Sequence, residues 1–379
     1  MDFTFSEEQQ MLLETTRRFI AKDYGFEARR KIMEKSAQGA NREVWQGLAD
    51  LGLLALNVPE QHDGLGGTPI ETMLVMTAMG EGLVLEPYLA SAVLATRMIS
   101  ALGTAAQQAA LLPSMAGGEL IAVLAHDEPA TRFDWKSVTT TAAAVDSGYV
   151  LTGHKSVVPH AASADILLVT ARIAAPGATG RLGVFTVPRS AAGLRQIPYA
   201  TVDGAGASEI RLDQVRLSAD ALLGTGETDA VTAIGEALDA GLAAVCAEAV
   251  GALDRLLAAT VEYTRTRKQF GVPIAKFQAL QHRMADMVLH IEQARSMSYL
   301  AAVRCADPDQ DARVSALSAA KVVIGQACRF VGQQAVQLHG GMGVTDELDV
   351  SHYFKRLMAI ELQFGSTDHH LEMVASRLN

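Results

Sequence analysis

Apolar residues recur at a helical spacing through the first part of the chain, about residues 1 to 117. Ser6 and Gln9 form a capping-box pattern in front of the first such run, which predicts the start of a helix. Residues 58–67 are rich in glycine and turn residues, so we expect a loop there. Further helices are expected over residues 42–54, 70–80, 90–102 and 104–116.

The apolar pattern changes to short β-leaning runs after residue 118. These runs are bounded by Gly, Pro or Asp, and such a series of short strands with regular turn signals favours a small β-barrel or sandwich. The expected strands cover residues 120–126, 138–145, 149–155, 166–172, 181–188, 193–198 and 207–215.

The helical spacing returns after residue 227 and continues to residue 379. Residues 240–267 are nearly all Ala, Leu, Val and Glu, which predicts a helix of roughly 40 Å at 1.5 Å per residue. Helices of similar length are expected over 277–304 and 311–338, and long helices with short connections are typical of a four-helix bundle. We therefore expect an α+β multidomain chain with domains at 1–117, 118–226 and 227–379.

The overall composition is that of a globular protein, with 49% hydrophobic and 20% charged residues. The formal net charge of −10 disfavours a nucleic-acid partner, because phosphate binding needs a basic face. The three cysteines, Cys246, Cys305 and Cys328, lack metal or redox spacing, which favours a reduced cytoplasmic protein. The acidic start predicts no signal peptide, and no apolar run reaches the roughly 18 residues of a membrane span, so we expect no membrane partner.

A basic segment ends the long helix predicted over residues 240–267. Basic residues in a last helical turn are favoured by the helix dipole, and Gly271 and Pro273 stop the helix, so a plain helix end explains the pattern. The alternative is an anion site, in which the planar guanidinium of Arg267 holds a diphosphate and Phe270 covers an adjacent aromatic ring.

A second glycine cluster follows the helix predicted over 311–338. Gly340, Gly341 and Gly343 would let a ligand approach the backbone, and Gln337 can contribute an amide. A helix C-cap with a tight turn explains the same residues. No Gly-x-Gly-x-x-Gly pattern follows a strand here, so the cluster is not a Rossmann fingerprint.

Several stretches together resemble the acyl-CoA dehydrogenase family. The resemblance covers essentially the whole chain, in the family's α–β–α order, and is most specific in the Arg-Lys-Gln-Phe-Gly segment with the Gln-Ala-Leu-Gln run that follows it. The stretches are 51–60, 64–67, 265–274, 277–281, 284–287 and 337–341.

The resemblance implies a fold, a reaction and a set of site residues. The fold would be an N-terminal α-helical domain, a middle β domain and a C-terminal four-helix bundle. The family oxidises the Cα–Cβ bond of an acyl-CoA to 2-enoyl-CoA with FAD, passes electrons to an electron-transferring flavoprotein, and is generally tetrameric. The residues implied at the FAD are Arg267, Gln269, Phe270, Gln337, Gly340, Gly341 and Thr367.

Two stretches depart from the family where its members contact the flavin ring. After Asp127-Glu128-Pro129 the family continues with small Gly and Ser residues, but this chain has the bulkier run 130–134. In the next motif Val157 stands where the family has Trp, and Pro159 stands where it has Thr. Proline has no N–H and no side-chain donor, so fewer contacts to the flavin ring are expected.

The family's catalytic base is also absent from its usual places. Aligned on Thr367, Gly365 occupies the position where many members carry the catalytic Glu, and the alternative position in some relatives falls near Gly241. Asp368 is a weak alternative base, because an acid in a first helical turn is explained by the helix dipole. Asp239 and Glu236 lie near Gly241 in the sequence. We expect no metal site at His369 and His370, because adjacent helical residues point in different directions.

These departures resemble the small subunit of two-component, pimeloyl-CoA-type dehydrogenases and the α2β2 enzymes of steroid side-chain breakdown. The hypothesis is a subunit that lacks the base and works with a second, base-bearing dehydrogenase chain. Two alternatives stay open: a homotetramer whose base is Asp368 or Asp239, and a scaffold that holds FAD or acyl-CoA without turnover. The acyl group is not readable from the sequence.

Overall fold

The computed structural model describes residues 4–35, 40–173, 180–225 and 229–377. It divides into two compact units. The helical unit contains residues up to 29, residues 69–84 and residues from 239 onward, and the sheet unit contains residues 30–68 and 85–238. The domain boundary predicted at residue 226 lies outside the described residues.

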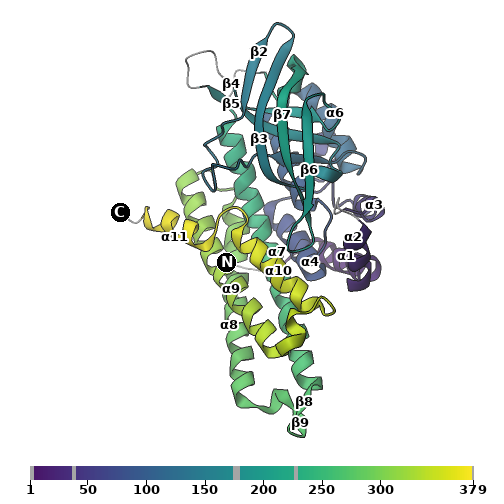
Figure 1. Cartoon of the computed structure of the whole chain (residues 1–379), viewed down its shortest axis with the longest axis vertical. Coiled ribbons are helices and arrows are strands. Elements are labelled where there is room, and N and C mark those ends of the chain that lie inside the picture. Colours follow the sequence, from purple (N-terminus) through teal and green to yellow (C-terminus); the bar gives the residue numbers. More distant parts are fainter. Residues whose placement is uncertain (1–3, 36–39, 174–179, 226–228, 378–379) are drawn as a thin grey trace. The chain divides into compact units, whose positions relative to one another are not determined.

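The sheet unit is built on one mixed β-sheet (Figure 1). The strand order is β1-β4-β2-β3-β7-β6, and β5 pairs with the other edge of β4. β1 and β2 run parallel to β4, and the remaining pairs are antiparallel. The strands are β1 Ala122–Ala125, β2 Thr141–Val145, β3 Gly148–Pro159, β4 Ile166–Ile173, β5 Arg181–Pro188, β6 Leu194–Ala200 and β7 Gly206–Ser218.

The strand predicted over 138–145 is too long at its start, since β2 begins only at Thr141. The backbone N–H groups of Thr139 and Thr140 donate instead to the carboxylate of Glu128, at 2.8 and 3.0 Å. A strand ladder cannot use donors that a side chain has taken, so the pairing with β3 starts one residue later.

Helices cover the sheet unit's core. They are α3 Arg42–Asp50, the π-helix Tyr88–Ala95, α5 Thr96–Leu102 and α6 Ala105–Ala116. Met98, Ile99 and Leu112 from these helices pack with strand residues such as Leu168 and Val184 in one apolar cluster. Such continuous burial is the main stabilising term of a domain of this size.

Two helix predictions in this unit are wrong in detail. The helix predicted over 42–54 ends at Asp50, because Gly52 adopts a left-handed φ of 75° and Leu53 N–H bonds back to the carbonyl of Leu48. The stretch predicted as one helix over 90–102 begins as a π-helix and becomes α-helical only at Thr96.

The helical unit is a set of long packed helices. Its members are α1 Glu7–Asp23, α4 Pro69–Gly82, the larger part of α7 Val231–Thr266, α8 Gln278–Arg304, α9 Gln310–His339, α10 Asp349–Leu362 and α11 Thr367–Ala375. α8 and α9 lie side by side, and α9 also packs against α10 and α11 (Figure 1). The capping box predicted at Ser6 and Gln9 is confirmed. The sequence prediction contained no helix at α10.

Glycines allow α4 and α7 to approach each other closely. A Cβ atom added at Gly80 would collide with the carbonyl oxygen of Glu248, and one added at Gly251 would collide with that of Thr77. Nearby, the carboxylate of Glu248 receives two hydrogen bonds from Arg356, at 2.6 and 2.7 Å. Small residues and a two-point ion pair therefore fix the centre of this unit.

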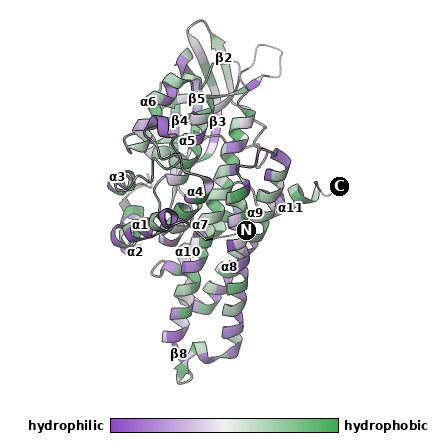
Figure 2. Ribbon diagram, turned by 180° about the vertical axis from the view of Figure 1, so that it is seen from behind, coloured by the Kyte–Doolittle hydropathy of each residue, from purple (hydrophilic) through white to green (hydrophobic). Residues whose placement is uncertain are grey.

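One helical stretch of the described residues, Gln310–Val344, is long and apolar enough to cross a membrane by length and composition alone. Half of its apolar window is buried inside the protein. Figure 2 shows hydrophilic as well as hydrophobic residues along α8 and α9. A central helix of a bundle meets the same length and composition criteria, so the feature is weak support for a membrane span.

Candidate functional site

The turn between α10 and α11 holds the position where the family's base is expected. Gly365 is buried and has a φ of 112°, a backbone conformation that favours glycine. A Cβ atom built there would lie 2.7 Å from Nε2 of His370 and 2.8 Å from Cδ2 of His369. The place where a carboxylate-bearing side chain would start is therefore filled by a histidine pair.

His370 holds this turn through both ring nitrogens. Nε2 lies 2.9 Å from the carbonyl oxygen of Phe364, and Nδ1 lies 3.1 Å from the hydroxyl of Ser318 on α9. Burial lowers the pKa of His370 to about 4, so the ring is neutral at pH 7. A neutral ring that donates from Nε2 to Phe364 and accepts at Nδ1 from Ser318 satisfies both contacts.

Lys321 on α9 also holds the turn between α10 and α11. Its Nζ donates to the carbonyl oxygens of Glu361 and Gly365, at 2.9 and 2.6 Å. The side chain is fully buried, and this burial lowers the pKa of the ammonium group. The ammonium group meets carbonyls at the C-terminal end of α10, where the helix dipole favours a cation.

Glu361, in the last turn of α10, is a buried carboxylate beside this turn, and the sequence prediction missed it. One of its oxygens accepts hydrogen bonds from Thr367 N–H and from the guanidinium of Arg329, both at 3.1 Å. Burial alone would raise its pKa, but Thr367, Arg329 and Lys321 together hold the pKa below its ordinary value. Glu361 is therefore an ionised group that caps the start of α11.

The predicted alternative bases Asp368 and Asp239, and Glu236 near Gly241 in the sequence, differ from Glu361 in their surroundings. Asp368 is exposed in the first turn of α11. Asp239 accepts a hydrogen bond at 2.7 Å from Nε of Arg313, within an ion pair. Glu236 is exposed on α7. No acid among these three combines burial at the turn with a free carboxylate.

The basic segment after α7 forms a projecting hairpin. β8 Lys268–Gln269 pairs with β9 Val272–Pro273, and the two turn residues Phe270 and Gly271 have φ values of 54° and 79°. Two successive residues with positive φ are typical of a tight two-residue hairpin. Arg267, Gln269 and Phe270 are all exposed, and Phe270 is 91% exposed.

The glycine cluster lies at the matching end of α9. Tyr263, one turn before Arg267, stacks on His339 with ring centroids 4.3 Å apart, and its hydroxyl donates to the His339 carbonyl at 3.3 Å. Gly340 and Gly341 follow directly and are exposed, and a Cβ atom on either would meet nothing within 4 Å. The structure thus brings the two sequence-predicted motifs to one end of the helical unit.

The remaining members of the predicted set have different surroundings. Gln337 is exposed in the last turn of α9. Thr367 is buried at the first position of α11, and any side chain at Gly325 would collide with its hydroxyl oxygen.

The region of Arg267 and Gly340–Gly341 offers a planar guanidinium group and open backbone. An anionic ligand with an aromatic ring fits these features, because the guanidinium group can bind the anion and the glycines allow close approach.

A buried ion pair organises the sheet unit near the departures from the family. Nζ of Lys155 lies 2.7 Å from the carboxylate of Glu128 and also donates to Thr170 and to the His126 carbonyl. Burial opposes the charge on both partners; even so, Lys155 and the hydroxyls of Thr139 and Thr140 hold the pKa of Glu128 below its ordinary value. The sequence prediction did not pair these residues.

Val157 lies at a bulge directly after this lysine. The pairing of β3 with β7 shifts register between Lys155 and Val158, and Val157 has a φ of 50° and is 52% exposed. A positive φ is a true outlier for a β-branched residue. The backbone thus has an unusual bend at the residue that the sequence analysis aligned with the family's Trp.

Comparison with known proteins agrees with this architecture. The family models for the N-terminal, middle and C-terminal domains of acyl-CoA dehydrogenase match residues 6–119, 124–215 and 231–379. Acyl-CoA dehydrogenase FadE12 of Mycobacterium tuberculosis is 31% identical over 355 residues, which are 92% of this chain and 90% of that protein.

Two solved structures show the same likeness. The ChsE4–ChsE5 complex from Mycobacterium tuberculosis matches with a TM-score of 0.88 and 28% identity, over 100% of this chain and 99% of the other. An FAD complex of PigA matches with a TM-score of 0.88 and 26% identity, over 100% and 99% of the two chains. The α–β–α fold class and the family predicted from the sequence are confirmed. The chain belongs to the acyl-CoA dehydrogenase family of oxidoreductases.

Proposed function

We propose that this chain is the base-lacking subunit of a heteromeric α2β2 acyl-CoA dehydrogenase. The complex would oxidise the Cα–Cβ bond of an acyl-CoA thioester to a 2-enoyl-CoA with FAD. The observation that carries the proposal is the turn at Gly365, in which His370 occupies the space that a side chain would need.

The reaction needs a base, and the turn at Gly365 is where this chain would be expected to supply it. Removal of the proton α to the thioester needs a positioned base. Near the turn, Glu361 is held by Arg329 and Thr367, and Asp368 is exposed. Asp239 is paired with Arg313. A second chain that bears the family's Glu would supply the missing carboxylate, and the likeness to a complex named for two proteins, ChsE4 and ChsE5, supports this arrangement.

The FAD residues are proposed from the resemblance and from their surroundings. FAD, when bound, accepts the hydride that leaves Cβ of the acyl group. Arg267 would hold its diphosphate, with Gln269 and Phe270 toward the adenine, and all three are exposed on the hairpin after α7. Gln337, Gly340 and Gly341 would offer an amide and open backbone at the end of α9. Thr367 is kept in this set on the resemblance alone.

The electron acceptor would be an electron-transferring flavoprotein, and the enzyme would work in the cytoplasm. The three cysteines are free and buried, which fits a reducing compartment.

The main experiment compares the chain alone with the chain co-expressed with a second, Glu-bearing dehydrogenase subunit. Turnover of a panel of acyl-CoA thioesters is followed with a ferrocenium acceptor. The pair is expected to elute together and to turn over, whereas the chain alone is expected to show no turnover. Full turnover by the chain alone would refute the proposal.

Acid-to-amide variants then locate the base within the complex. Asp368→Asn, Asp239→Asn and Glu361→Gln in this chain are expected to keep turnover, while the amide variant of the partner's Glu abolishes it. Loss of turnover in any of the three, with assembly and flavin content unchanged, would place the base in this chain and favour a self-sufficient enzyme.

A flavin measurement tests the cofactor residues independently of turnover. Arg267→Ala is expected to lower the FAD bound per complex, read from the absorbance of the purified protein. Arg265→Ala is the matched control, because Arg265 is also exposed, two residues earlier on α7. Equal flavin loss in both variants would remove Arg267 from the site.

A further inference from the structure

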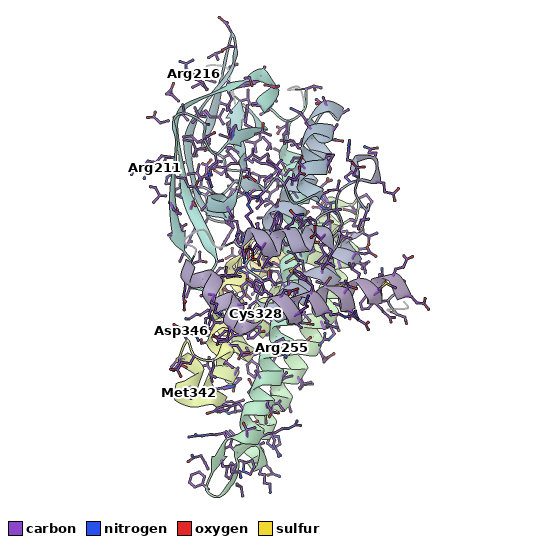
Figure 3. All side chains as sticks on the ribbon, turned by 90° about the vertical axis from the view of Figure 1, so that its right-hand side faces the viewer. Arg211, Arg216, Arg255, Cys328, Met342 and Asp346 are labelled. Atoms are coloured by element: carbon purple, nitrogen blue, oxygen red, sulfur yellow. The ribbon has the colours of Figure 1, made fainter. Side chains whose placement is uncertain are left out.

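A row of basic side chains crosses the sheet unit's outer face. Arg211 on β7 lies directly opposite His154 on β3 and directly opposite Arg195 on β6. Residues that face each other across antiparallel strands have side chains on the same side of the sheet. Both arginines are exposed, and Figure 3 shows Arg211 on the outer side of the sheet.

The two arginines have no counterion among the described residues. Neither guanidinium group forms an ion pair or a side-chain hydrogen bond in that part of the chain. The acids two residues from Arg211 along β7 are Glu209 and Asp213. The carboxylate of Glu209 is already bound by His154 at 2.6 Å, Tyr199 at 3.2 Å and the N–H of Val157 at 3.3 Å. Among the described residues, no ion pair joins Asp213 to either arginine. Like charges directly opposite each other destabilise a sheet, so the pair is unfavourable for the fold itself.

Apolar and aromatic groups border this arginine pair. Ile197 lies opposite Glu209 in the register and is 38% exposed, and Tyr199 follows two residues later on the same strand. Val157 is exposed at the neighbouring bulge. Arg and Tyr beside exposed aliphatic groups are the residue types enriched where proteins dock, and a strand face is flat rather than concave like a small-ligand site.

We propose that the face formed by Arg195, Arg211, Ile197 and Tyr199, here called the arginine face, docks the acidic surface of the protein that accepts electrons from this enzyme. The proposal rests on the proposed function, since it names the surface by which that reaction's acceptor would bind. The partner is defined by its chemistry: a redox protein that presents carboxylates at its docking surface.

The charge of the chain and the position of the arginine face both support an acidic redox protein as the partner. The chain carries a formal net charge of −10, so an acidic partner is repelled by most of the molecule and attracted where guanidinium groups stand unopposed. The arginine face lies beside the Val157 bulge, where the resemblance places the residue that covers the flavin. An acceptor guided to this face would therefore approach the flavin side of the sheet unit.

The test uses the assembled enzyme with two electron acceptors. One is the host's own electron-transferring flavoprotein, and the other is the ferrocenium ion, which needs no docking surface. The test variant is Arg195→Ala/Arg211→Ala. Arg216→Ala is the matched control, because Arg216 is exposed on the same strand but pairs with Val150, outside the row.

The double variant is expected to lose about tenfold or more in kcat/KM for the flavoprotein, and to keep its ferrocenium activity. Its salt dependence should flatten, because exposed charges act over about 10 Å at 0.1 M salt. Its melting temperature should stay the same or rise, because a repulsive pair has been removed. Arg216→Ala should behave as wild type.

Other outcomes would overturn the inference. Unchanged kcat/KM for the flavoprotein removes the docking role. An equal loss with both acceptors points to the substrate or flavin site, and loss of subunit assembly makes the face a subunit interface. If the wild-type complex reduces neither acceptor, the proposed function itself fails, which is distinct from failure of the docking surface.

Discussion

Replacement of Gly365 by alanine is expected to destabilise the protein strongly, although it adds a single methyl group. Non-glycine residues in glycine-favouring backbone regions cost about 1–3 kcal/mol. The new Cβ would start 2.7 Å from Nε2 of His370, so the ring must move. Its contacts to Phe364 and Ser318 are worth about 1 kcal/mol each. The expected loss is therefore about 3–5 kcal/mol if the ring leaves both partners.

The assay is urea unfolding of the isolated chain, followed by circular dichroism. Gly25→Ala serves as the control, since a Cβ atom there meets nothing within 4 Å. His370→Ala and the double variant Gly365→Ala/His370→Ala complete a cycle. The double variant is expected to lose less stability than the sum of the single losses, because the part of the clash that involves His370 needs both side chains.

A loss below about 1 kcal/mol for Gly365→Ala would refute this reasoning, because the turn would then accept a side chain without displacing His370. Additive losses in the cycle would refute the clash as the cause while leaving the backbone cost in place. Gly365→Glu is expected to fold less well than wild type and to gain no turnover as an isolated chain.

Three further predictions concern stability. Gly251→Ala should cost more than about 2 kcal/mol in urea unfolding, because its Cβ would collide with the backbone of α4, and a loss equal to that of Gly25→Ala would contradict this close packing. Arg356→Met should cost about 3–5 kcal/mol, because it leaves the buried carboxylate of Glu248 unpaired, and a thermal melt that matches wild type would argue against that ion pair. Because the pKa of His370 is lowered in the fold to about 4, the unfolded chain binds the proton first, so stability should fall by about 1.5 kcal/mol from pH 6.5 to pH 5. His370→Gln should remove this component, and an unchanged pH slope in that variant would contradict it.

Local signals in the sequence predicted much of the fold. The capping box at Ser6 depends on residues three positions apart, and the ends of α9 were predicted within one residue of Gln310 and His339. Helix periodicity and caps are short-range, so they can be read from one stretch. The start of β2 was wrong because Glu128, more than ten residues earlier, takes its backbone donors.

For the candidate site too, the sequence predicted the local features but not the contacts between distant residues. Gly365 and Arg267 can be identified from the sequence alone, and the resemblance to the family implies their roles. Whether an acid is free depends on partners far along the chain: Asp239 meets Arg313, and Glu361 meets Arg329. No local pattern encodes such pairs, so the state of each carboxylate had to come from the three-dimensional structure.

The turn between α10 and α11 also bears on how this chain could evolve. The glycine codons GGA and GGG differ from the glutamate codons GAA and GAG by a single base, so from either of these two codons one mutation would place an acid at residue 365. The structure resists that step, because His370 occupies the space and Lys321 binds the carbonyl of Gly365 itself. Reversion would need a change at position 370 first, and that change costs stability before any gain in activity. Under the proposed function, packing at this turn, rather than the genetic code, would keep such a lineage dependent on a base-bearing partner subunit.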